Sequence, residues 1–306
     1  GEGGGSQAVD IAQPNAIMEQ ERISWLSAAG MKIDRAESVL SQSTFERIFG
    51  LTKKCPWLLG RQKELSSLSS ECVSEDELLL VIDLLERFSY VDGPEVARRC
   101  AQIRDKIISD WSLSKEDTRI VCKSIEEMTD SSVAVNYFLQ QSFGAVGWKK
   151  DNFSKYLSRS IENKNINNIV IVDDFSGTGN SLKELSLWIE KKQELLLNKK
   201  FFVCLFCAME QTFLQDYNGV FSDIFSIEIQ KKGISDYNEG DVVRNLFVMS
   251  GIEERIRTSK KYRLGYEGSE ALYCTENFNI PNNNFPVFWQ TRSGKGSTRS
   301  ALFGRI

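Results

Sequence analysis

The sequence of 306 residues contains no histidine. Ser-His-Asp and Cys-His active sites need an imidazole as their base, and many zinc sites need one as a ligand, so these designs are excluded. Any catalytic chemistry must therefore depend on carboxylates, hydroxyls, lysine, arginine, tyrosine, backbone dipoles or a hard cation such as Mg²⁺.

Long apolar runs and a strong charge excess are also missing. No apolar run approaches the ~18 residues that cross a bilayer, so we expect no membrane partner. The net charge of −4 argues against a surface that generally coats nucleic acid, although a local basic patch stays open. Residues 1–6 resemble a flexible linker or an expression scar rather than a signal peptide. We therefore expect a cytoplasmic protein, with residues 1–17 outside any folded domain.

The seven cysteines are scattered along the chain. An odd number without the spacing of a small disulfide-rich domain predicts free thiols in a reducing compartment. Cys204 and Cys207 form a Cys-x-x-Cys pair, but they lie inside the apolar run from Phe201 to Ala208. A buried strand explains this pair better than zinc binding or redox chemistry.

The stretch from Asn168 to Ser181 carries the strongest local signal. Four consecutive β-branched residues, 169–172, predict a strand buried on both faces, and Asp173 and Asp174 stand where it would end. A short loop follows, and then an amphipathic stretch from Leu182 to about Leu196. Backbone N–H groups of a loop and the N-terminus of a helix bind phosphate, so this order of strand, acidic pair, loop and helix can bind a phosphorylated sugar. The phosphate-binding candidates are Ser176, Gly177, Thr178, Gly179, Asn180 and Ser181.

These residues resemble the signature of the type I phosphoribosyltransferases. That signature is an apolar strand, two acidic residues, three variable residues, Thr-Gly, one variable residue, and then Thr or Ser. The resemblance implies that the loop holds the 5-phosphate of phosphoribosyl pyrophosphate. It also implies that Asp173 and Asp174 are the catalytic residues and contact the ribose 2- and 3-hydroxyls. The same two carboxylates could hold the water shell of Mg²⁺, which is the expected cofactor.

Other readings of the acidic pair stay open. Receiver domains also carry Asp-Asp at a strand end, but they lack a Thr-Gly loop directly after it, and haloacid-dehalogenase-like phosphatases space their aspartates two apart. A loop that merely turns the chain is a further alternative. One departure from the family also matters: many purine-transferring members have an Asp where this chain has Gly177, so purine salvage is doubtful. Binding of the sugar phosphate could survive without transfer.

The rest of the chain predicts an α/β fold with an N-terminal helical region. Residues 18–112 read as helical, with a capping-box pattern at Ser74 and Glu77 and a helix start at Asp92-Gly93-Pro94. Strands and helices alternate within residues 113–306, which predicts a mostly parallel sheet of phosphoribosyltransferase-like topology. The expected elements there are strands at 118–124, 201–207, 223–229 and 271–274 and helices at 133–141 and 242–256, with Gly144 just past the first helix.

In the type I family a second loop, after an earlier strand, binds pyrophosphate. The matching stretch here runs from Lys123 to Ser132 and lacks the usual short basic-and-glycine form. Lys123, Ser131 and Ser132 are candidate pyrophosphate contacts, and ordinary helix capping is an equal alternative. Glu126 or Glu127 could supply a base from the same loop. The polar stretch 145–167 matches a mobile loop of the family, although a solvated loop is the simpler interpretation.

The C-terminal part carries a second resemblance. Residues 264–272, 276–289 and 302–305 look like a divergent bacterial phosphoribosyltransferase-like branch found in conflict and anti-phage loci, some of whose members accompany retron reverse transcriptases. Asn277, Asn282 and Asn283 can pair with a base edge, and Phe285 or Trp289 can stack on a base; an ordered turn beside a core tryptophan is an equal alternative. The basic residues Arg292, Lys295, Arg299 and Arg305 form an acid-free tail that suits solvent or nucleic acid.

Two classes of function remain. The first is an effector enzyme that binds phosphoribosyl pyrophosphate or a nucleotide and acts on nucleotides by glycosyl transfer or hydrolysis, in anti-phage defence. The second is a non-catalytic nucleotide sensor that regulates a partner, such as a subunit of a reverse-transcriptase complex with its nucleic acid. The intact Asp173-Asp174 and Thr178-Gly179 favour the enzyme, and Gly177 favours the sensor. A homo-oligomer is compatible with both.

Overall fold

A computed structural model describes residues 41–123, 130–192, 198–293 and 296–305. The chain divides into one unit of residues 41–86 with 300–302, and a second unit of residues 87–299 with 303–305. Each unit is described by itself. The predicted linker at 1–17, the base candidates Glu126 and Glu127, and Lys295 lie outside the described residues.

The first unit is helical, as the sequence predicts. Ser41 caps its first helix by accepting a hydrogen bond from the Thr44 N–H. Ser74 accepts from the Glu77 N–H at 3.2 Å, but the Glu77 carboxylate reaches the N–H of Val73 rather than that of Ser74. The capping box is therefore present with its return bond shifted by one residue. The helices are α2 (Gln42–Lys54), the 3₁₀ helix η1 (Pro56–Arg61), α3 (Gln62–Glu71) and α4 (Glu75–Glu86).

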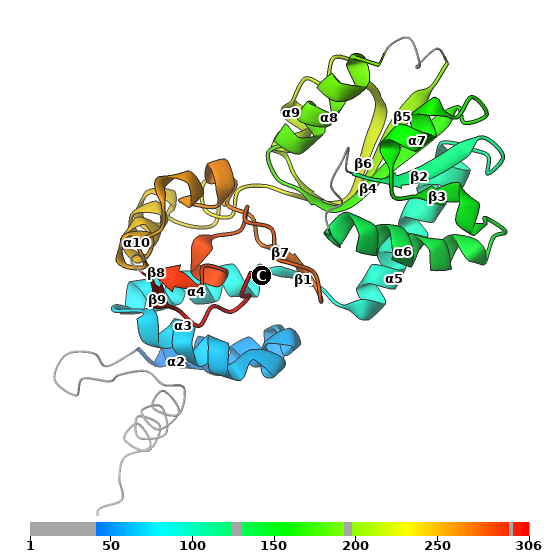
Figure 1. Ribbon diagram of the computed structural model, residues 1–306. Helices are drawn as coiled ribbons and strands as arrows, with labels where there is room; N and C mark the ends of the chain where they lie inside the picture. Colours follow the sequence, from blue (N-terminus) through cyan, green and yellow to red (C-terminus); the bar gives the residue numbers. More distant parts are fainter. Residues whose placement is uncertain (1–40, 124–129, 193–197, 294–295, 306) are drawn as a thin grey trace, which may run out of the picture. The chain divides into compact units, whose positions relative to one another are not determined.

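The second unit is built on a parallel sheet of five strands (Figure 1). The order is β3-β2-β4-β5-β6, and every neighbouring pair is parallel. β4 is central and buried along almost its whole length, which the β-branched run predicts. The strands are β2 (Thr118–Cys122), β3 (Phe153–Ser154), β4 (Asn168–Ser176), β5 (Lys200–Met209) and β6 (Phe221–Gln230).

Helices cover both faces of this sheet, because β4 sends successive side chains to opposite sides. Val170 and Val172 pack in a core with α5 (Gly93–Asp105) and α6 (Asp130–Gly144). Ile169 and Ile171 pack in a second core with α7 (Leu157–Glu162) and α8 (Asn180–Glu190). A π-helical turn, η2 (Lys106–Asp110), continues α5. The α/β class and the mostly parallel sheet are therefore confirmed.

A second part of this unit lies beside the sheet edge formed by β6. Its two-stranded parallel pair joins β1 to β7, which are far apart in the sequence. Its other elements are the helix α10, three short 3₁₀ helices and one hairpin. The elements of this part are β1 (Ser89–Val91), α10 (Val242–Arg255), η5 (Lys260–Tyr262), η6 (Tyr266–Gly268), β7 (Tyr273–Thr275), η7 (Pro286–Phe288), β8 (Arg292–Ser293) and β9 (Ser297–Thr298). Two short helices belong to the part with the sheet, α9 (Gln211–Leu214) after β5 and η3 (Lys150–Asn152) before β3.

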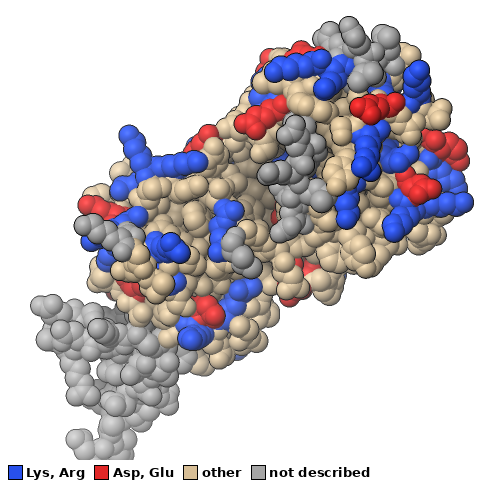
Figure 2. Space-filling view, in the orientation of Figure 1, with Lys and Arg blue, Asp and Glu red and all other residues tan. Residues whose placement is uncertain are grey.

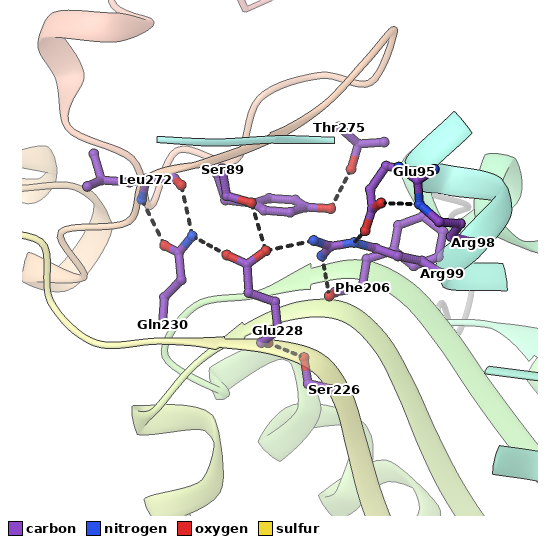
Figure 3. Close-up of polar contacts among 11 residues, drawn as sticks. Ser89, Glu95, Arg98, Arg99, Phe206, Ser226, Glu228, Gln230, Leu272 and Thr275 are labelled. Carbon is purple, nitrogen blue, oxygen red and sulfur yellow. Dashed lines mark hydrogen bonds and ion pairs between the residues drawn. The ribbon is translucent and has the colours of Figure 1, made fainter. Parts of the chain in front are cut away.

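A buried arginine ties β1 and the sheet edge together (Figure 3). Arg99 of α5 donates to the carbonyl of Phe206 at 2.8 Å and to the carboxylate of Glu228 at 2.9 Å. The same oxygen of Glu228, Oε1, also reaches β1, because it accepts from the Ser89 hydroxyl at 2.7 Å. Gln230 adds the β7 side, donating to Leu272 O and accepting from Leu272 N. This network fixes the β1–β7 pair against β6.

Several boundaries differ from the predicted ones. β4 does not end before the aspartates but continues through them to Ser176, because β5 pairs with it as far as Ala208. Gly144 lies inside α6 rather than beyond it. Ala271 is not part of β7 but forms an isolated bridge with Asn284. Within the described residues, no helix is both long and apolar enough to span a bilayer.

Candidate functional site

The two predicted catalytic carboxylates are buried in β4, with Asp173 3% and Asp174 4% exposed. Asp173 Oδ2 lies 2.6 Å from Lys123 Nζ, and its Oδ1 accepts from the Ser131 hydroxyl at 3.3 Å. The structure therefore brings two of the predicted pyrophosphate contacts to the acidic pair, and it does so through the end of β2 and the start of α6.

Lys123 and Asp173 form a nearly buried ion pair, with side chains 15% and 5% exposed. Burial opposes the charge of the Lys123 ammonium, but the carboxylates of Asp173 and Asp174 outweigh it and raise the pKa of Lys123 above its usual value. Lys123 therefore stays charged and neutralises one of the two carboxylates.

One carboxyl oxygen of Asp174 lacks a hydrogen-bond partner among the described residues. This atom, Oδ2, is buried. Burial, together with the charge of Asp173 and a hydrogen bond to it, raises the pKa of Asp174 well above its usual value. An unpaired buried carboxyl oxygen costs free energy, so this atom is suited to a polar ligand group such as a sugar hydroxyl.

The side chains around the pair do not fit a Mg²⁺ ion that the protein itself coordinates. Lys123 Nζ lies 2.6 Å from Asp173 Oδ2, in the position where a metal ion would bind. The other oxygen, Oδ1, accepts hydrogen bonds from the N–H of Asp174 and from the Ser131 hydroxyl. In the described part of the chain, no three acidic or cysteine side chains gather as a metal site. We therefore derive no step through a metal ion.

The loop after β4 presents backbone N–H groups. Gly179 has φ +84° and begins α8, and the Thr178 hydroxyl accepts from the N–H of Asn180 at 3.2 Å. The loop is largely buried, yet the described residues provide no acceptor for the N–H groups of Gly177, Thr178 and Gly179. Buried N–H groups are nearly always paired, so three in a row at a helix N-terminus make a site for an anion.

The loop carbonyls point the other way, which explains why the N–H groups are free. The Thr212 hydroxyl of α9 donates to the carbonyl oxygens of Ser176 and Gly177, at 3.4 and 3.2 Å. Gln215 donates to the carbonyl of Thr178 at 3.3 Å and to the side chain of Asn180 at 2.7 Å. The segment after β5 therefore holds the loop with its donors turned away from α9.

An asparagine far along the chain covers the loop. A Cβ at Gly177 would lie 2.0 Å from Nδ2 of Asn283, so a larger residue here would push the Asn283 side chain away from the loop. The Asn180 side chain also donates to Glu267 at 2.7 Å. The sequence offers Asn283 as one of three asparagines with no reason to prefer it, and only the packing of the C-terminal segment selects it.

Other predicted contacts serve the fold in the described structure. The Ser132 hydroxyl donates to the carbonyl of Val172 and accepts from the N–H of Lys123, at 2.7 Å each. The Asn282 carbonyl accepts from the N–H of Tyr266. Trp289 donates to the Asn284 carbonyl at 2.8 Å and packs edge-on against Tyr262 at 5.4 Å.

The basic segments do not gather at this site. Arg299 donates to the carbonyls of Gln290 and Val287, and Arg305 lies 5.6 Å from the Trp289 ring, so these arginines are folded against the chain. The predicted mobile loop contains η3, β3 and α7. Lys149, Lys150, Lys155 and Arg159 in this stretch are exposed. On the face shown in Figure 2, Lys and Arg are interspersed with Asp and Glu.

Comparison with known proteins fits this geometry. A model of the PRTase-CE family matches residues 72–305, which is more than half of the chain and includes the whole parallel sheet, the acidic pair and the loop. No curated protein matches the chain. The chain belongs to the PRTase-CE family, and its fold is phosphoribosyltransferase-like.

Proposed function

We propose that the chain binds a phosphorylated ribose, as phosphoribosyl pyrophosphate or a nucleotide, and acts on nucleotides. The phosphate would lie on the loop 176–181, and the ribose hydroxyls would meet Asp173 and Asp174. The observation that carries this proposal is the row of backbone N–H groups at Gly177, Thr178 and Gly179, directly before α8, for which the described residues provide no acceptor.

The acidic pair supports the sugar part of the proposal. Asp174 Oδ2 has no partner in the described chain and can pair with a ribose hydroxyl. Asp173, which is paired with Lys123 at 2.6 Å, would bring its carboxylate near the sugar. A carboxylate in that position stabilises the positive charge that develops on the ring when the bond to the base or pyrophosphate breaks. Lys123 in turn offers positive charge to the departing anionic group.

Calorimetry with ribose 5-phosphate tests the proposed site. Thr178→Val with Ser181→Ala removes two hydroxyls from the loop and leaves its glycines in place. A hydrogen bond to a charged group contributes about 1.5–3 kcal/mol, so affinity should fall at least about tenfold. The matched control makes the same two kinds of change at Ser297 and Thr298, which are exposed in β9. Equal affinity of the folded loop variant and the control would refute phosphate binding at this loop.

A second variant separates the sugar contact from the phosphate contact. Asp174→Asn keeps the shape of the side chain but removes the carboxylate oxygen that has no partner. We expect weaker binding of ribose 5-phosphate and unchanged binding of inorganic phosphate. A loss of both to the same extent would mean that Asp174 holds the loop rather than the sugar.

A sensor without turnover is the second candidate. The observation in its favour is Gly177, where the chain has no carboxylate and where Asn283 fills the space of a side chain. Purified protein incubated with nucleotides, nicotinamide dinucleotide or phosphoribosyl pyrophosphate should give a new product by mass spectrometry if it is an enzyme. Binding without any product, alone and with Mg²⁺ added, would favour the sensor.

The biological setting is part of the proposal. The C-terminal resemblance to the branch found in anti-phage loci supports an effector role in bacterial defence, with a reverse transcriptase and its nucleic acid as partners. Co-purification with a reverse transcriptase encoded beside this chain, and phage protection lost with Asp174→Asn, would support that role. Protection that persists in the folded variant would separate defence from the ribose site.

A further inference from the structure

The helix α10 has an apolar surface on its exposed side. Its buried residues are Met249, Ile252 and Glu253, which fix the side that packs against the rest of the unit. Val243 and Phe247 lie on another side of the helix and are each 80% exposed. Side chains four residues apart are neighbours on a helix, so these two form one continuous apolar surface rather than two isolated residues.

Gly251 continues this surface by one further turn. It lies four residues after Phe247, and a Cβ there would meet nothing within 4 Å among the described residues. The described part of the chain therefore gives no packing reason for glycine, which costs about 1 kcal/mol relative to alanine inside a helix. A glycine beside exposed apolar side chains suits close packing of a second helix, because a large side chain of that helix fits into the gap that the glycine leaves.

The two ends of α10 carry charges of opposite sign. The residues at its beginning include the exposed acids Glu239 and Asp241, and those after its end include the exposed bases Arg257, Lys260 and Arg263. Two such helices that pack antiparallel bring the acidic end of each over the basic end of the other, and their helix dipoles are then also favourably aligned. The charges therefore favour a second copy of the same helix as the partner.

We propose that α10 forms a two-fold interface with α10 of a second copy of this chain. In an antiparallel pair with Phe247 over Gly251 of the second copy, Asp241 is level with Arg257 of that copy, because Asp241 precedes Phe247 by as many residues as Arg257 follows Gly251. The two-fold axis repeats each of these contacts. This interface does not depend on the ligand of the loop after β4.

The size of the contact sets the expected strength of the dimer. The 14 residues of α10 make a helix about 21 Å long. A contact of that length and about one helix diameter in width is smaller than the roughly 1,600 Å² of a standard interface. We therefore expect a dimer that dissociates in the micromolar range.

Sedimentation equilibrium of the full chain, at roughly 1 to 200 µM, measures the dissociation constant around the expected value. Phe247→Ser removes the aromatic side chain at the centre of the contact and should raise this constant at least about tenfold. The matched control Tyr137→Ser removes an aromatic side chain of α6 that is 58% exposed, and it should leave the constant within about twofold of the wild type.

Gly251→Gln separates the interface from the fold. Glutamine is a better helix former than glycine, and its Cβ meets no described residue of its own chain, so the unfolding midpoint of the monomer should not fall. The same side chain occupies the space that Phe247 of the second copy needs, so the dissociation constant should rise at least about tenfold. A role of Gly251 in the fold alone would change the midpoint and leave the dissociation constant as it is.

Charge reversal tests the antiparallel arrangement. Glu239→Lys and Lys260→Glu should each weaken the dimer about threefold at low salt, because each places like charges together at both ends of the pair. The double variant exchanges the acidic and the basic end, so its dissociation constant should return to within about twofold of the wild type. A further weakening in the double variant would contradict the antiparallel pair.

A wild type that stays monomeric over the whole concentration range would overturn the proposal. A lower unfolding midpoint of Phe247→Ser would then show that another segment of the same chain covers this surface, and an unchanged midpoint would leave the surface to a different protein. A dimer whose dissociation constant is unchanged in both Phe247→Ser and Gly251→Gln would place the contact elsewhere and would overturn the proposal as well.

Discussion

Replacing Gly265 by alanine should destabilise the chain much more than the same change at Gly268. The two glycines have φ of +86° and +68°, so both replacements force an L side chain into the left-handed region at a cost of about 1–2 kcal/mol. The space around them differs. A Cβ at Gly265 would lie 2.0 Å from Asn283 O, 2.7 Å from its carbonyl carbon and 3.2 Å from Asn284 O, whereas Gly268 has nothing within 4 Å.

The atoms in the way at Gly265 belong to backbone that is held in place. Asn283 O accepts from the N–H of Ala271, and the Asn284 side chain binds Tyr273 on both of its backbone groups. Overpacking against such a structure adds about 1–3 kcal/mol. We therefore expect a total cost of about 2–5 kcal/mol for Gly265→Ala and about 1–2 kcal/mol for Gly268→Ala.

Urea unfolding followed by circular dichroism measures the difference. Since the slope is about 1–3 kcal/mol per molar urea for small proteins, the midpoint of Gly265→Ala should lie roughly 1 M below that of Gly268→Ala. The variant should also lose affinity for nucleotides more than the control does, because Asn283 would move off the loop. Equal midpoints would refute the described packing of residues 264–284 and the argument built on it.

Three further predictions concern buried charges. Burial raises the pKa of Glu253 to about 7, with the charge of Glu270 acting in the same direction, while the N–H of Leu264 and the charge of Arg263 oppose it. The stabilising contribution of Glu253 is therefore complete below its unfolded pKa near 4.5 and is lost as the pH rises through about 7. Relative to Glu253→Gln, the wild type should lose up to about 3 kcal/mol of unfolding free energy between pH 4.5 and 8. The control Glu254→Gln changes an exposed neighbour and should follow the wild type. A constant difference between wild type and Glu253→Gln in denaturant titrations across this range would contradict the shift. Arg99→Met leaves Glu228 without its arginine partner and should cost about 3–5 kcal/mol of unfolding free energy in the same assay. The control Arg98→Met changes a side chain that is 66% exposed and should cost less than about 1 kcal/mol. Similar losses in the two variants would mean that the network of Figure 3 does not hold β1 to β6. The affinity for ribose 5-phosphate should change less than about twofold between excess chelator and added Mg²⁺, because Lys123 already neutralises Asp173. A strict requirement for the metal in calorimetry would show that a cation displaces the lysine.

Local patterns in the sequence were sufficient for the parallel sheet and for the position of the loop between β4 and α8. Four β-branched residues predict β4, and glycine and hydroxyl residues before an amphipathic stretch predict the turn into α8, because strand burial and helix starts depend on neighbours within a few residues. The buried state of Cys204 and Cys207 in β5 follows in the same way from an apolar run. The end of β4 did not follow, since pairing with β5 sets how far a strand continues.

Tertiary structure alone decided what surrounds the acidic pair and the loop. Lys123 lies next to Asp173 because β2 and β4 are adjacent and parallel, so the carboxyl ends of the two strands lie at the same edge of the sheet. Asn283 meets Gly177 because the C-terminal segment folds back along β7. No periodicity connects residues so far apart, and the three consecutive asparagines are equivalent in the sequence. Packing separates them: the carbonyl of Asn282 accepts from the N–H of Tyr266, the side chain of Asn283 covers Gly177, and Asn284 is buried. The sequence by itself thus determined the scaffold and the loop after β4, whereas long-range packing decided which charge balances the carboxylates and which side chain covers the loop.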